Sequence, residues 1–91
     1  MVITDILTRP EIMSRSGIIV SISKCCNENP REVFLELAKL AARRTSQMLG
    51  AHVEFIEDVL IVDEEYHSTA LILAKFRKAL LLAAKLRAGI A

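Results

Sequence analysis

The segment that decides the fold is NPREVFLELAKLAARRTSQMLG, residues 29–50, because it carries start, periodicity and stop signals of one helix. Asn29 can accept the free amide hydrogens at the start, and Pro30 suits the first helical turn. Gly50 is suited to the left-handed conformation that ends a helix. Between them, apolar residues recur at helical spacing: Phe34, Leu37, Ala38, Ala41 and Met48. The pattern predicts a helix over residues 30–49.

Segments rich in β-branched residues lie on both sides of this helix. GIIVSIS, residues 17–23, is uncharged and too short for an independent helix, which predicts a buried strand over 18–23. HVEFIEDVLIVD, residues 52–63, predicts a hairpin divided at Glu57-Asp58. That pair lacks the glycine that tight turns prefer, so a single bent strand remains the alternative.

Helices are predicted near both ends of the chain. A capping box at Thr8 predicts a short helix over 9–15. A longer helical pattern runs from Glu64 to about Ala88 and stops at Gly89. The elements follow the order α-β-α-β-β-α in one domain, residues 1–91. The predicted fold is a small two-layer α+β domain, in which a short three-stranded antiparallel sheet carries two long helices on one face.

The composition points to self-association in a reducing compartment. The 91 residues are 53% hydrophobic but only 4% aromatic, and a small fold often cannot bury so much aliphatic surface. Adjacent cysteines such as Cys25 and Cys26 are too close for an unstrained disulfide, which favours free thiols. The sequence shows neither a signal peptide nor an apolar run long enough to span a membrane. We expect a cytoplasmic homo-oligomer, a dimer or larger.

The last helix supplies the predicted interface. Its apolar residues cover more of the helix circumference than an ordinary surface helix needs. We expect the excess surface to contact a second copy or another protein. The centre of this contact is predicted at one stripe of the helix: Leu73, Phe76, Leu80 and Ala83.

Charge segregation supports a second interpretation, nucleic-acid binding. Residues 54–65 contain six acidic and no basic residues, whereas residues 75–87 contain five basic and no acidic ones. Nucleic acid would contact basic side chains of the two long helices, namely Arg43, Arg44, Lys75, Lys78 and Lys85. The net charge of +1 and the absence of an aromatic stacking platform disfavour this interpretation. The acidic run could instead meet the basic helix of a second subunit.

Fewer sequence features support an enzymatic or a metal-binding interpretation. Cys25 and Arg31 match the spacing of the phosphate loop in cysteine-dependent phosphatases, but their loop lacks glycine and contains Glu28. Glu36, Glu64 and His67 would supply the ligand types of a di-iron site only in a symmetric dimer. We therefore expect no catalytic residue, metal or cofactor. The favoured function is a non-catalytic, homo-oligomeric module for protein interaction or regulation, which binds through its apolar last helix.

Overall fold

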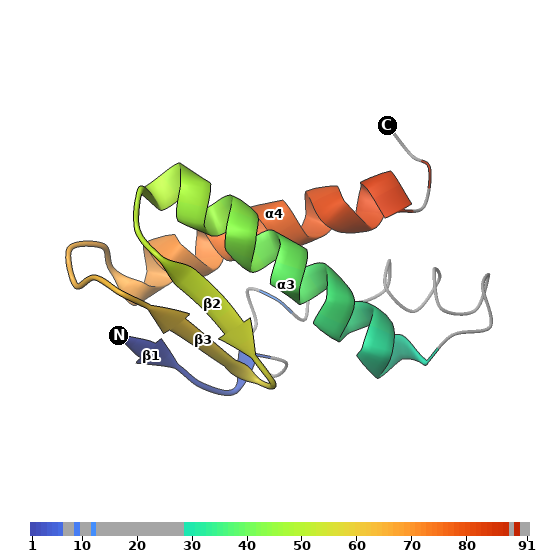
Figure 1. Cartoon of the computed structure of the whole chain (residues 1–91), viewed down its shortest axis with the longest axis horizontal. Helices are drawn as coiled ribbons and strands as arrows, with labels where there is room; N and C mark the ends of the chain where they lie inside the picture. The colour runs from blue at the N-terminus through green and yellow to red at the C-terminus, as the bar shows by residue number, and fades with distance from the viewer. Residues whose placement is uncertain (7–8, 10–11, 13–28, 88, 90–91) are drawn as a thin grey trace.

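Two long helices and three short strands form the part of the chain that the computed structural model describes, residues 1–6, 9, 12, 29–87 and 89 (Figure 1). The elements, in chain order, are β1 (Val2–Ile3), α3 (Pro30–Leu49), β2 (Val53–Ile56), β3 (Val59–Val62) and α4 (Thr69–Arg87). The strands form one antiparallel sheet, and the helices pack on it. This arrangement confirms the predicted α+β class with two long helices.

Helix α3 begins and ends at the predicted residues. The Asn29 side chain accepts a hydrogen bond from the Arg31 amide at 2.8 Å, which satisfies one free donor of the first turn. Gly50 adopts a left-handed conformation with φ of 68°, and its amide donates to the Ser46 carbonyl. These contacts place the end of α3 only three residues before β2, so the strand folds back along the helix (Figure 1).

Residues 52–63 form a hairpin, so the alternative of one bent strand is wrong. Val53 pairs with Val62 and Ile56 pairs with Val59, which leaves Glu57-Asp58 as the turn. Glu57 takes φ of 55°, a left-handed conformation that is costly for a residue other than glycine. The turn therefore forms in spite of its sequence, because strand pairing and burial on both sides impose it.

The third strand of the sheet comes from the start of the chain. Val2 and Ile3 pair with Ile61 and Leu60, so β3 lies between β1 and β2. Two residues are too few to produce a recognisable strand pattern in the sequence. The strand predicted at 18–23 lies outside the described residues, as does most of the helix predicted at 9–15.

Helix α4 begins at Thr69, so the prediction that it starts at Glu64 is wrong. The Glu64 carboxylate accepts hydrogen bonds from the amides of Tyr66 and His67, which holds these residues in a loop. The Ser68 hydroxyl then accepts from the Leu71 amide at 3.2 Å and satisfies a donor of the first turn. These side-chain hydrogen bonds to backbone amides compete with helical hydrogen bonds, so the helix begins later in the sequence than predicted.

Three phenylalanines join the helices to the sheet. Phe55 of β2 lies 5.9 Å from Phe34 of α3 and 6.0 Å from Phe76 of α4, measured between ring centroids. Both helices therefore cover the same face of the sheet, as predicted. Figure 1 shows α3 and α4 running in opposite directions, and Arg87 near the end of α4 contacts Glu36 in the first half of α3 at 2.7 Å.

Candidate binding face on the helical layer

Two neighbouring depressions lie between α3 and α4, and the described residues that line them all belong to these helices. The depressions share Arg44, Ala79 and Leu82, so they form one continuous groove along the helix pair. We call this surface the helical face and define it by eight exposed or partly exposed side chains of the groove: Leu40, Arg44, Met48, Lys75, Lys78, Leu82, Lys85 and Leu86.

Large apolar side chains of the helical face are open to solvent. Leu86 is 65% exposed, Leu40 is 49% exposed and Leu82 is 44% exposed. Met48 is 42% exposed, although it continues the apolar stripe of α3 whose other members are buried. Single exposed apolar residues are normal on a protein surface, but several that line one groove are typical of an interaction site.

Cations border these apolar side chains. Arg44 extends from α3, and Lys75, Lys78 and Lys85 extend from α4 around the same depression as Met48 and Leu82. The structure thus brings together four of the five basic residues that the sequence suggested for nucleic-acid contact. The fifth, Arg43, lines a separate groove between α3 and β2.

Three of the four residues predicted at the centre of the interface belong to the buried core. Leu73, Phe76 and Leu80 are at most 3% exposed, whereas Ala83 is partly buried and lines the groove. The first three are covered within one chain and do not contribute to an open surface in this fold. The exposed large apolar side chains of α4 are instead Leu71, Leu82 and Leu86. Of these, Leu82 and Leu86 line the groove, spaced i,i+4 beside the lysines. The i,i+4 spacing of Leu82 and Leu86 beside the lysines is the sequence signal that could have identified this surface.

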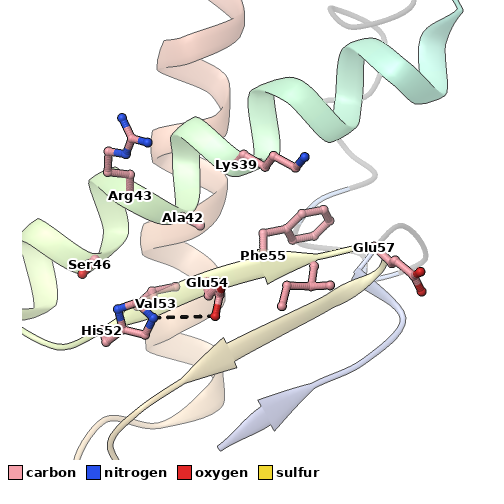
Figure 2. A pocket seen from close by; sticks show the side chains of 10 residues that line it. Lys39, Ala42, Arg43, Ser46, His52, Val53, Glu54, Phe55 and Glu57 are labelled. Carbon is pink, nitrogen blue, oxygen red and sulfur yellow. Dashed lines mark ion pairs between the residues drawn. The ribbon is translucent and has the colours of Figure 1, made fainter.

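The groove between α3 and β2 has a different character (Figure 2). Lys39 and Arg43 extend from the helix, His52 directly precedes β2, and Glu54 lies on it. His52 Nε2 is 3.7 Å from the Glu54 carboxylate, and both side chains are more than half exposed. Charges of both signs therefore line this groove, and it shows no single preference for a charged ligand.

The sheet has a second surface, on the side away from the helices. Strand alternation and pairing place Val2, Glu54, Ile56, Val59 and Ile61 on this side, and we call it the sheet face. Val2 is 62% exposed and Ile56 is 47% exposed, while Val59 and Ile61 are partly buried. An antiparallel sheet with one solvent-facing side usually carries polar residues there, so this apolar face is unusual.

Glu64 and His67 form a local contact in the loop before α4, with 2.8 Å between the carboxylate and Nδ1. Burial alone would raise the pKa of Glu64. Hydrogen bonds from the His67 side chain and from the amides of His67 and Tyr66 outweigh that effect and place the pKa below its ordinary value. Glu36 pairs with Arg87 instead. Among the described residues, no group of three or more His, Cys, Asp and Glu side chains is placed to hold a metal ion.

Cys25 and Cys26 lie outside the described residues, whereas Arg31 is an exposed residue of the first turn of α3. Within the described ranges, neither long helix combines the length and apolar character needed to cross a membrane. No known protein family, curated protein or solved structure matches this chain.

Proposed function

We propose that this chain is a non-catalytic protein-interaction module of the cytoplasm, and that its helical face binds an apolar partner surface with acidic borders. One observation carries the proposal: exposed Leu40, Met48, Leu82 and Leu86 line the same groove as the four cations. Burial of apolar side chains supplies binding free energy, and the surrounding charges select the partner and its orientation. A groove between two helices is a common docking site for an amphipathic helix.

A synthetic peptide can test this proposal. The probe is a fluorescein-labelled amphipathic helix of about 18 residues, with leucines on one face and glutamates beside them. We expect binding by fluorescence anisotropy, and Leu82→Ala should weaken it at least tenfold, or about 1.4 kcal/mol. Leu71 is the matched control, because it is 40% exposed on α4 but outside both depressions. Equal losses from Leu82→Ala and Leu71→Ala would contradict the proposal.

A second peptide separates the apolar contribution from the electrostatic one. It replaces each glutamate with lysine and keeps the leucines. The two peptides therefore differ only in charge, and the second one is repelled by the cations of the helical face. We expect this peptide to bind more weakly at low salt, with the difference shrinking as salt screens the charges. Equal affinities of both peptides at low salt would mean that the cations do not select an acidic partner.

Nucleic-acid binding is the second candidate, because Arg44, Lys75, Lys78 and Lys85 gather around one depression. Binding of labelled single-stranded and duplex DNA should then weaken steeply with salt, and Lys78→Ala should lower the salt slope by about one unit. Leu82→Ala would have little effect on such binding. DNA affinity that depends on Lys78 but not on Leu82 would favour this candidate over the protein-interaction module.

A further inference from the structure

The sheet face and the helical face have complementary charges. Glu54 lies on the sheet face itself, with Glu57 at the hairpin turn and Asp63 just beyond β3. These acids belong to the segment 54–65, which contains no lysine or arginine. The helical face carries Arg44 and three lysines around its apolar groove. Each face therefore joins exposed apolar side chains to charges that are mainly of one sign, and the two signs are opposite. Glu36 is the one acid that lines the described part of the helical groove, and it is paired with Arg87.

The two faces belong to different layers of the fold. The helices cover the inner side of the sheet, where Phe55 meets Phe34 and Phe76, and the sheet face is the outer side. Within the described part of the chain, the residues that line the groove of the helical face all belong to α3 and α4. Both faces can therefore be occupied at the same time, by different molecules.

We propose that the helical face of one copy binds the sheet face of the next copy, so that the chain assembles head to tail. This inference rests on the proposed function and names a second copy of the chain as the partner. Leu82 and Leu86 would pack on Ile56 and Ile61, while Lys78 and Lys85 would lie near Glu54. The contact supplies the outer side of the sheet with a helical layer, the arrangement that buries both sides of a sheet in many α/β structures.

Charge argues against the two symmetric alternatives. Two helical faces placed together would bring Arg44, Lys78 and their neighbours close to the same cations of the other copy. Two sheet faces placed together would bring Glu54 and Glu57 close to the same acids. Like charges at an interface disfavour association, whereas the helix-to-sheet contact joins opposite charges.

A head-to-tail contact leaves one free face at each end of an assembly. Such contacts produce rings if the rotation between copies closes, and open filaments if it does not. We therefore expect the mass of the wild-type protein to increase with concentration and to pass beyond a dimer. Sedimentation velocity or light scattering after size exclusion, from about 10 to 500 µM, measures this growth and spans the affinities of weak interfaces.

Two variants separate the faces. Leu82→Gln with Leu86→Gln removes apolar side chains from the helical face and retains good helix formers. Ile56→Thr with Ile61→Thr does the same on the sheet face and retains good strand formers. Both leave the charges unchanged. Circular dichroism and thermal melting establish that each variant folds, and Leu71→Gln serves as the control because Leu71 lies outside the groove.

The decisive measurement is the mixture of the two variants. Each alone should be a monomer, because each lacks one of the two required faces. Mixed in equal amounts they should form a heterodimer of twice the 10.1 kDa mass of one chain, because the first retains the sheet face and the second retains the helical face. Growth beyond a heterodimer should not occur. The Leu71→Gln protein should assemble like the wild type.

Three outcomes would overturn the inference: a monomeric wild type at 500 µM, assembly that either folded variant retains, or folded variants that stay monomeric when mixed. The first of these leaves the proposed function testable, because a monomer can still bind the acidic peptide through Leu82. If the wild type is monomeric and the peptide does not bind, both proposals fail. If the wild type is monomeric and the peptide binds, only self-assembly fails.

Discussion

Phe55 of β2 and Phe76 of α4 stack with their ring centroids 6.0 Å apart and their planes 18° from parallel. Phe76 is fully buried, although the sequence pattern placed it at the centre of an interface with another copy. The stacked pair joins the hairpin to the last helix, so Phe76 contributes to the stability of the fold. Its substitution is therefore a test of folding rather than of association.

We expect Phe76→Ala to lower the free energy of unfolding by about 3–5 kcal/mol, because it leaves a cavity and removes an aromatic contact. Urea denaturation followed by circular dichroism measures the change. Leu71→Ala removes an exposed apolar residue from the same helix and should cost less than about 1 kcal/mol. Similar losses in the two variants would show that Phe76 is not part of the core.

The hairpin turn offers a stabilising substitution. Glu57 has φ of 55°, which costs an ordinary residue about 1–2 kcal/mol and glycine almost nothing. Glu57→Gly also gives the unfolded chain more freedom, so we expect a net gain of about 0.5–1 kcal/mol in the free energy of unfolding. Gly50→Ala is the opposite control, since Gly50 has φ of 68° and its substitution should destabilise the protein. A loss of stability in Glu57→Gly would contradict the observed turn.

The loop before α4 should respond to acid. The folded state lowers the pKa of Glu64 below its ordinary value of 4.5, mainly through hydrogen bonds that overcome burial. The carboxylate therefore stabilises the fold fully at higher pH, and this contribution is lost as the pH falls through the lowered pKa. Glu64→Gln should make unfolding less dependent on pH below about 4.5, as measured by urea denaturation from about pH 3 to 6. The same pH dependence in wild type and variant would exclude this role for Glu64.

The contact between Arg87 and Glu36 should contribute little to stability. Their charged atoms are 2.7 Å apart, but the Glu36 side chain is 62% exposed. Water and salt screen such pairs, so we expect Glu36→Gln to cost less than about 1 kcal/mol at low salt and less still at 1 M salt. A cost that persists unchanged at 1 M salt would indicate that this pair holds α3 and α4 together by more than exposed electrostatics.

The elements with complete local signals could be predicted from the sequence. Asn29 and Gly50 define α3 because a side-chain cap and a left-handed glycine act within a few residues. The hairpin was predictable from its β-branched residues, although Glu57-Asp58 lacks the glycine of a tight turn and a single bent strand remained an alternative. β1 was not predictable, because two residues carry no periodicity and their pairing depends on residues about 60 positions away.

The candidate site was predictable only in part. Periodicity shows that α4 has excess apolar surface, but it does not distinguish a leucine against the core from one facing solvent. Leu80 is buried and Leu82 is 44% exposed because α3 and the sheet contact α4 from particular directions. The cations were easier to predict, since charged side chains almost always remain at the surface. Their gathering with Met48 and Leu82 around one groove required the packing of the two helices.

The pairing of β1 with β3 has a consequence for the order of folding. The elements from α3 to α4 follow one another closely along the chain, and their contacts, such as Ile56 with Val59, close short loops. Val2 meets Ile61 only by closing a loop of about 60 residues, which has a larger entropic cost. We expect α3, the hairpin and α4 to assemble first, with β1 adding to the edge of β3 at the end. The central position of β3 in the sheet is then the last feature of the fold to be completed.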